Sequence, residues 1–325
     1  KNPECGWFFS AKPDDFKKIP GSPIAYWIKG ISNFDGLKLS DLMISGGRTK
    51  THGNDKYIRY FWEISNIIGS KWEPYANGGE FRKFYGNEIH VVDWSDAAKS
   101  FYSEHGGLYN NIFWGTVGIT WSLITSSLNS FRVKTKEAHY SSGSPTIFTK
   151  DYELDTYILG FLNSKITSYY LKAINPTLNT TVGDVLSLPL KFYKKIDIEV
   201  NIKKNIEISK YYWNCYETSW NFIENPLIRT HQPNLRQAFN IWQKQNADAV
   251  AEMKRLEEEN NKLFIEAYGL QDELTPDVPD ERITLTRADR EKDSQRLVSY
   301  ALGCMMGRYS LDEPGLIYAH AGNQD

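Results

Sequence analysis

Residues 234–267 read NLRQAFNIWQKQNADAVAEMKRLEEENNKLFIEA, the most regular pattern in this chain. An apolar residue recurs every seven positions, at Trp242, Ala249, Leu256 and Leu263. The intervening apolar position of the repeat holds Phe239 and Met253. A seven-residue repeat places these side chains in one stripe along an α-helix, where they can pack against a second helix. The stretch therefore predicts a long helix with one buried face.

The segments on either side of this stretch are also expected to be helical. Asn201–Asn225 carries apolar and small residues on one side, and Pro226 separates it from the long helix because proline interrupts helices. Together the two segments predict a long antiparallel helical hairpin. A last helix is expected from about Ala288 to Arg308, with Thr286 as its N-cap. We therefore expect residues 201–325 to form an all-α spacer or docking domain.

Residues 1–200 have a different sequence pattern, in which short apolar runs are broken by glycine, proline and polar turns. Runs at 24–28, 57–64, 89–94 and 146–148 are rich in aromatic and β-branched residues and have the length of strands. Helices are expected at Asp151–Ala173 and at Glu80–Tyr85. The pattern predicts an α/β (α+β) domain over residues 1–200, ahead of the helical domain.

Composition limits the class of protein. No run reaches the eighteen or so apolar residues that a membrane span needs, and the mean hydropathy is −0.51. The chain opens KNPE, so we expect a fragment that begins inside a longer protein and has no signal peptide. Its three cysteines form no Cys-x-x-Cys pair, which favours a reducing cytoplasm and argues against a structural zinc site. Residues 1–200 hold 23 Lys and Arg against 20 Asp and Glu, while residues 201–325 hold 15 against 20.

Sequence motifs for catalysis are missing. None of the Gly-Gly doublets extends into a Gly-x-Gly-x-x-Gly or phosphate-loop pattern, and no Ser lies in Gly-x-Ser-x-Gly. The six histidines form no pair with metal-ligand spacing. Asn175-Pro176-Thr177-Leu178 approaches the Asn-Pro-Pro-Tyr loop that grips a flipped adenine, but it lacks the second proline and the aromatic ring. We therefore expect no catalytic residue and no metal site in this sequence.

Three loops combine basic, amide and aromatic residues, at 45–56, 71–87 and 129–136. Arginine and asparagine can read base edges, and lysine and threonine can hold phosphate. The candidate DNA-contacting residues are Arg48, Thr49, Lys50, Asn54, Lys56, Arg59, Lys71, Asn77, Arg82, Lys83, Asn129, Arg132, Lys134 and Lys136. Arg48 and Asn54 are expected to read bases. Lys134 and Lys136 alternate along a strand, which predicts one exposed face suited to phosphate.

Other interpretations remain open at this point. Each loop alone is equally consistent with an ordinary solvated turn. The apolar repeat and the acidic second half also fit a protein-interaction module whose basic loops are incidental. A free-standing enzyme such as a hydrolase would need a clustered acid and base, and no spacing in the sequence identifies one.

Several strings resemble the region that follows the catalytic domain in BREX-type adenine-specific DNA methyltransferases (the PglX family). They include GNDKYIRYFWE at 53–63, PYANGGEFRKFYGN at 74–87, LKAINPTLN at 171–179, FIEAYGLQDEL at 264–274 and YALGCMMGRYSL at 300–311. The Leu-Asn-Ser string at 162–164, followed by Asn-Pro-Thr and LSLPL at 186–190, is also similar to target-recognition domains of type I specificity subunits and fused restriction-modification enzymes.

This resemblance implies a C-terminal target-recognition region that reads double-stranded DNA in an anti-phage defence system. The parent enzyme would methylate the exocyclic amine of adenine with S-adenosylmethionine after flipping the base. The cofactor-binding and Asn-Pro-Pro-Tyr motifs of the family would lie upstream, so we expect no cofactor in this fragment and no methyl transfer by it alone. The expected partners are the upstream methyltransferase domain and other defence-system proteins, with no membrane involved.

Overall fold

Two four-stranded sheets form the centre of the first part of the chain in the computed structural model, which describes residues 12–64, 71–109, 111–125, 128–151 and 153–318. One sheet has the order β1 (Met43–Ile44), β8 (Thr146–Thr149), β5 (Gly118–Trp121) and β6 (Phe131–Lys134), with antiparallel neighbours throughout. The other has the order β2 (Ile58–Tyr60), β4 (His90–Asp93), β3 (Trp72–Ala76) and β7 (His139–Tyr140). Within it, β7 runs parallel to β3 and the other pairs are antiparallel.

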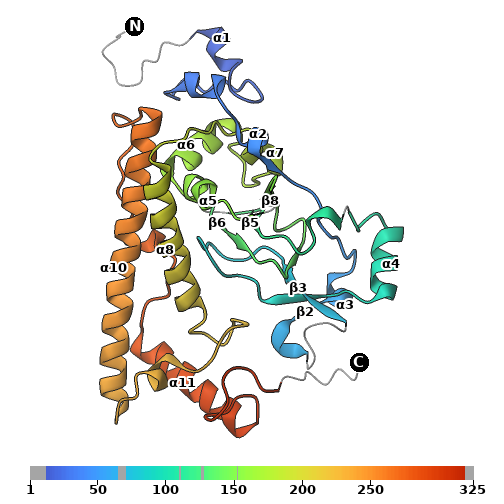
Figure 1. Ribbon diagram of the computed structural model, residues 1–325, viewed down its shortest axis with the longest axis vertical. Helices are drawn as coiled ribbons and strands as arrows, with labels where there is room; N and C mark the ends of the chain where they lie inside the picture. Colours follow the sequence, from blue (N-terminus) through green and yellow to red (C-terminus); the bar gives the residue numbers. More distant parts are fainter. Residues whose placement is uncertain (1–11, 65–70, 110, 126–127, 152, 319–325) are drawn as a thin grey trace.

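Helices cover the first sheet and extend beyond it (Figure 1). Short helices precede and interrupt the strands, at α1 (Pro13–Phe16), α2 (Leu39–Leu42), α3 (Asn54–Tyr57) and α4 (Asp96–Glu104). After the last strand come α5 (Thr156–Leu162), α6 (Lys165–Ile174), α7 (Val182–Leu186), α8 (Lys195–Trp213), α9 (Pro226–Arg229), α10 (Leu235–Tyr268) and α11 (Arg290–Met305). Single 3-10 turns lie at Ile31–Asp35, Phe61–Glu63, Asn111–Phe113 and Asp280–Arg282. The expected order, α+β followed by helices, is confirmed.

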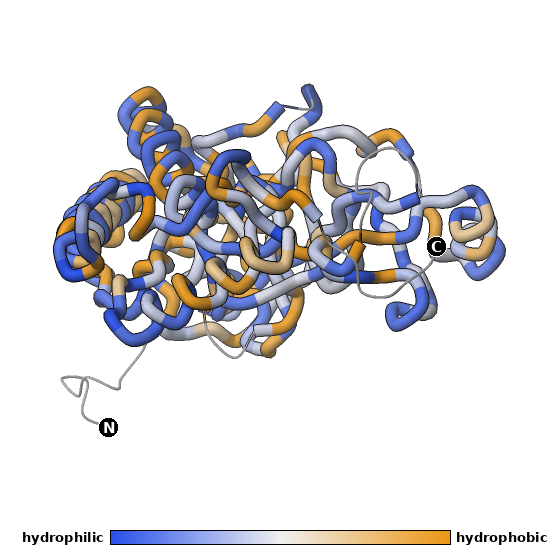
Figure 2. The backbone as a smooth tube through the Cα atoms, turned by 90° about the horizontal axis from the view of Figure 1, so that it is seen from below, coloured by the Kyte–Doolittle hydropathy of each residue, from blue (hydrophilic) through white to orange (hydrophobic). Residues whose placement is uncertain are grey.

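The long helix predicted from the seven-residue repeat is α10. The Asn234 side chain caps its first turn by accepting from the Gln237 amide at 3.0 Å. Gly269 ends it with a φ of 66°, a left-handed conformation that glycine adopts without strain. Both Met253 and Leu256 of the repeat are buried, as expected. Figure 2 shows hydrophobic and hydrophilic residues alternating along the helices, which fits helices with one buried face.

The predicted antiparallel hairpin is confirmed, with α8 as the partner of α10 (Figure 1). Lys204 pairs with Glu252 at 2.7 Å, and the Tyr212 hydroxyl donates to the Gln245 carbonyl at 2.8 Å. As one residue number rises the other falls, which defines the antiparallel direction. The sequence predicts the first helix of the hairpin at Asn201–Asn225, whereas α8 starts at Lys195 and ends at Trp213.

Turns replace several expected helical residues, because asparagine and serine side chains there bond to neighbouring groups. After α8, the Ser219 hydroxyl donates to Asn214 at 2.6 Å, within a turn. The helix expected over 151–173 is divided by Asn163, whose amide bonds to both backbone groups of Phe131. Likewise, the last helix is capped by Asp289 and not by Thr286, whose carbonyl accepts from Asn246.

Three further expectations are corrected by the structure. Residues 24–28 contain a turn and no strand, and the strand expected at 57–64 is limited to β2. Residues 80–85 are not helical, because the backbone of Phe84 pairs with the edge of β6. Its amide donates to the Phe131 carbonyl at 2.8 Å, and its carbonyl accepts from Val133 at 2.9 Å.

One hydrophobic core joins the two parts of the chain. It contains Trp121 and Phe161 from the first 200 residues, and Ile202, Met253 and Phe264 from the remainder. The boundary at residue 200 stays a prediction, and α8 crosses it. Among the described residues, no helix has the length and apolar character that crossing a bilayer requires.

Candidate nucleic-acid interface

The first basic loop, residues 45–56, is held in place by its own backbone. The loop comes directly after β1 in the chain and lies beside the first residue of β8, where the Ser45 hydroxyl donates to the Thr146 carbonyl at 2.6 Å. Further along, the Thr49 amide donates to Tyr140 at 2.8 Å and the Lys50 amide to Gly107 at 2.7 Å. These bonds fix the loop against both sheets and the turn after α4. Its side chains therefore project from a defined backbone.

Three of the predicted residues in this loop are exposed. Arg48 lies over the Tyr109 ring at 4.7 Å and donates to its hydroxyl at 3.2 Å, which lowers the pKa of Tyr109. Lys56 is exposed beside the Tyr57 ring, and Asn54 opens helix α3 while accepting from the Thr51 hydroxyl at 2.6 Å. A tyrosine beneath a guanidinium orients it without neutralising it. The positive charges of Arg48 and Lys56 are therefore available to an anionic partner.

Four other predicted DNA-contacting residues, in this loop and shortly after it, are less accessible. Thr49 is fully buried and its carbonyl accepts from the Tyr75 hydroxyl at 2.8 Å, so its side chain is not a phosphate contact. Lys50 is half-buried. Arg59 donates to the Asp55 carbonyl at 2.7 Å, and Lys71 lies 3.8 Å from the Asp93 carboxylate.

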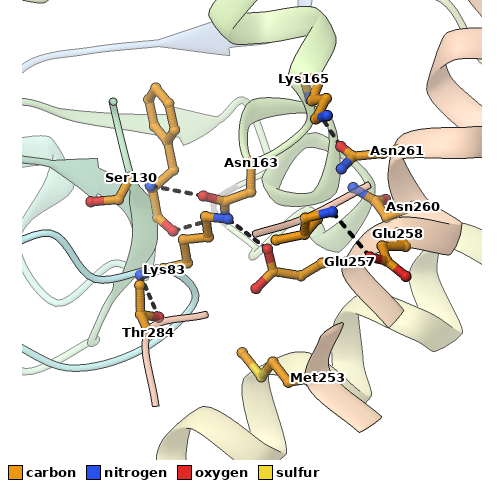
Figure 3. A network of polar contacts seen from close by, with 12 residues as sticks. Lys83, Ser130, Asn163, Lys165, Met253, Glu257, Glu258, Asn260, Asn261 and Thr284 are labelled. Atoms are coloured by element: carbon orange, nitrogen blue, oxygen red, sulfur yellow. Dashed lines mark hydrogen bonds and ion pairs between the residues drawn. The ribbon is translucent and has the colours of Figure 1, made fainter. Parts of the chain in front are cut away.

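The second loop does not present its basic pair to solvent, which corrects the prediction for Arg82 and Lys83. Arg82 lies 4.7 Å over the Trp213 ring and donates to the Thr284 carbonyl at 3.2 Å. Lys83 is buried, and its ammonium pairs with the Glu257 carboxylate of α10 at 2.5 Å (Figure 3). Both cations therefore join the sheets to the helices.

A polar network surrounds this ion pair (Figure 3). The Lys83 amide donates to the Thr284 hydroxyl at 3.2 Å, and the Lys165 amide donates to Asn261 at 2.9 Å. The Asn260 amide donates to the Gly160 carbonyl at 2.9 Å. Burial raises the pKa of the Glu257 carboxyl, and the adjacent Lys83 ammonium opposes that shift. The network is structural: it fixes α10 against α5, α6 and the Lys83 loop.

The third loop also departs from the prediction. Arg132 and Lys134 lie on β6 with 1% of each residue exposed, so the shared phosphate-facing surface of Lys134 and Lys136 does not exist. Both faces of β6 are covered. Arg132 donates to the Gly78 carbonyl at 2.9 Å, and Lys134 donates to the Thr116 carbonyl at 2.7 Å. Lys136, beyond the strand, is exposed.

Burial shifts both basic groups of β6. It lowers the pKa of Arg132 to about 10 and that of Lys134 to about 8, although the Glu88 carboxylate opposes both shifts. An unfolded lysine keeps its ordinary pKa near 10.5. Between pH 8 and 10 the unfolded chain therefore holds a proton that the folded chain has released, and raising the pH favours folding.

We expect the unfolding free energy of the native chain, relative to Lys134→Met, to rise by about 1.4 kcal/mol per pH unit between pH 8 and 10. Urea unfolding of both chains at pH 7, 8, 9 and 10 measures this difference. Methionine keeps the apolar stem and removes the titrating group, so other ionisations cancel. A difference that stays constant with pH would show that Lys134 titrates normally in the folded chain.

The two asparagines predicted to contact DNA from the second and third loops differ in their availability. The Asn129 side chain accepts from the Thr180 hydroxyl at 2.9 Å and is half-buried. Asn77 is half-buried too, but its side chain makes no hydrogen bond within the part of the chain that the structure describes. The residues missed from sequence are the partners of the basic groups, Tyr109, Glu88 and Glu257. No local pattern identifies them, since Glu257 lies 174 positions from Lys83.

Comparison with known proteins places the chain beside a class of bacterial enzymes, the adenine-specific methyltransferases. It is 33% identical to the adenine-specific methyltransferase PglX of Lacticaseibacillus casei (strain Zhang), over 98% of this chain and 29% of that protein. It is also 33% identical to the adenine-specific methyltransferase BrxX of Escherichia coli O9:H4 (strain HS), over 98% of this chain and 28% of that protein. The chain thus spans less than a third of either relative, and the resemblance inferred from the sequence strings is confirmed as homology to part of these proteins.

No protein-family model matches the chain. Among solved structures, the type IIL restriction-modification enzyme MmeI in complex with DNA gives a TM-score of 0.44 at 14% identity, over 80% of this chain and 36% of that one.

Proposed function

We propose that this chain is the DNA-sequence-recognition portion of an adenine-specific DNA methyltransferase of an anti-phage defence system. Methyl transfer from S-adenosylmethionine would occur in a catalytic domain outside this sequence, with other defence proteins as partners. The two methyltransferase relatives support the enzyme class. The observation that carries the recognition role is the loop at 45–56, where Arg48 and Lys56 are exposed on a backbone fixed by hydrogen bonds.

A rigid basic loop suits the phosphate backbone of DNA. Lysine and arginine contacts to phosphate release counterions, so affinity falls as salt rises, with a slope near −0.9 per contact. Arg48, Lys50 and Lys56 are separated by few residues, and none of them forms an ion pair with a carboxylate in the part of the chain that the structure describes.

We expect the triple variant Arg48→Glu, Lys50→Glu, Lys56→Glu to bind duplex DNA weakly and to lose up to about three units of salt slope. Fluorescence anisotropy with a labelled duplex at several salt concentrations measures both. The matched control reverses Arg236, Lys244 and Lys262, which are exposed on α10, at the opposite edge of the molecule from α4 (Figure 1). If the native chain shows no salt-dependent binding, or the two triple variants behave alike, the assignment of this loop fails.

A second function has one observation in its favour. The exposed face of α11 carries Val298, Leu302 and Met305, and its C-cap Met306 is exposed as well; an apolar surface of this kind is typical of a protein contact. The chain could accordingly dock a methyltransferase to its partners, with the basic loop incidental. Retained duplex binding by a Leu302→Asp, Met305→Asp variant would separate this contact from DNA recognition.

A further inference from the structure

Four loops meet at the end of the first sheet and form a surface that we call the loop rim, residues 77–79, 122–125, 141–144 and 175–181. Backbone and hydroxyl bonds connect them in series. The Ser122 hydroxyl donates to the Gly79 carbonyl at 2.8 Å, and the Leu123 amide donates to Gly143 at 3.0 Å. The Thr180 amide in turn donates to the Leu123 carbonyl at 2.9 Å.

The composition of the loop rim differs from that of the chain as a whole. Its four segments contain no Asp, Glu, Lys or Arg, although these residues make up 24% of the chain. In their place are asparagine, serine, threonine and glycine, with a few aliphatic side chains. Phosphate contacts use lysine and arginine, whereas base edges are read by amides and hydroxyls and by apolar contact with the thymine methyl group. The composition therefore fits the edges of bases better than the DNA backbone.

The segment 175–181 is a rigid support for the residues at its tip. The Asn175 amide group donates to the Asp184 carboxylate at 2.9 Å, and its oxygen accepts from the Thr177 amide at 3.0 Å. The Trp121 indole donates to the Thr180 carbonyl at 2.8 Å. A side chain carried by such a support loses little conformational entropy on binding, which favours specific contacts.

The tip carries side chains that are exposed to solvent. Leu178 is 61% exposed, and Ile124, which lies beside Asn179 in an isolated β-bridge, is 66% exposed. Asn179 is exposed, and its backbone groups are bonded. Its side-chain amide makes no hydrogen bond to any described residue. A free amide with two exposed aliphatic residues as its neighbours is thus carried on a backbone fixed by hydrogen bonds.

The loop rim adjoins the basic loop. Ser45 bonds to Thr146 at the beginning of β8, two residues after the rim segment 141–144. Thr49 bonds to Tyr140, the residue before that same segment. The basic loop therefore begins at the same end of the sheet as the loop rim, and the exposed Arg48 and Lys56 follow along that loop. Duplex DNA has a matching arrangement, because phosphates flank the base edges exposed in each groove.

We propose that Asn179, Leu178 and Ile124 enter a groove of the bound duplex and determine part of the recognised sequence. Asn179 would bond the N6 and N7 groups of an adenine, and the two aliphatic side chains would contact thymine methyl groups. This proposal rests on the function proposed above. It assigns base reading to the rim and leaves backbone binding to the loop at 45–56.

The test is selection of duplexes with a randomised core by the purified chain, followed by sequencing of the recovered DNA. The native chain is expected to enrich a short motif. Asn179→Ala should relax the preference at one base pair and weaken binding to the enriched duplex roughly 5- to 150-fold, with binding to random duplex unchanged. Gln243→Ala, an exposed amide on α10, is the matched control and should enrich the native motif.

The outcomes separate the two proposals. Failure of the native chain to bind duplex DNA would overturn the proposed function and the rim assignment with it. Binding without enrichment of any motif, or an unchanged motif in the Asn179→Ala, Leu178→Ala and Ile124→Ala variants, would overturn the rim assignment alone. Equal melting temperatures of the variants and the control establish that the change is local, and the Arg48, Lys50, Lys56 variant should lower recovery of all duplexes without altering the motif.

Discussion

Replacing Lys83 with methionine is expected to lower the free energy of unfolding by about 3–5 kcal/mol. The Lys83 and Glu257 side chains are only 11% and 4% exposed, and their contact of 2.5 Å joins the edge of the sheets to α10. Without the ammonium, the carboxylate is left in the interior, where its second oxygen already has no partner among the described residues. An uncompensated buried charge has a large free-energy cost, which the folded state alone bears.

Chemical denaturation measures this loss, and two comparisons define its origin. Lys204→Met removes an ion pair to α10 whose lysine is 53% exposed, so it should cost less than about 1 kcal/mol. The double variant Lys83→Met, Glu257→Leu removes both charges and should recover most of the lost stability, because an apolar pair of similar volume needs no compensation. Equal stability of Lys83→Met and Lys204→Met would contradict the importance of this buried pair.

Leu256→Ala is expected to destabilise the chain by about 2–5 kcal/mol, through lost apolar burial and the cavity left behind. Leu256 is 1% exposed, in the seven-residue repeat of α10. Ile241 of the same helix is 37% exposed, so Ile241→Ala should cost much less and controls for the change in helix propensity. Thermal unfolding followed by far-ultraviolet circular dichroism compares the two. A similar melting temperature for both variants would mean that the repeat does not face the core.

The helical part of the fold could be predicted from sequence because its signals are local. The apolar repeat of α10 extends over several turns, and Asn234 and Gly269 mark its ends with residues suited to helix caps. The ends of α8, the division at Asn163 and the pairing of Phe84 with β6 depend on partners distant in the sequence. Short segments have little intrinsic preference, so these tertiary contacts decide their conformation.

The candidate interface was only partly predictable for a related reason. A cluster of basic residues indicates positive charge, but it does not indicate which side chains another segment covers. Arg48 and Lys56 are exposed, whereas Arg132 and Lys134 are buried by the loops that contain Gly78 and Thr116. Asn179 belongs to the string LKAINPTLN, which resembles the methyltransferase family, and that string does not indicate a role for its side chain. Its free side chain became evident once the bonds of the surrounding loops were known.

The common core of the two parts has a consequence for how such a protein can acquire a new specificity. A chimaera joined near residue 200 would combine the Trp121 and Phe161 side of one core with the Met253 and Phe264 side of another. It would also separate Lys83 from its own Glu257. Recombination at that point should therefore yield poorly folded hybrids, whereas exchange of a few loop-tip residues leaves every core contact intact. Divergence of recognition in this scaffold is expected to proceed by point substitution at the surface, on a conserved interior.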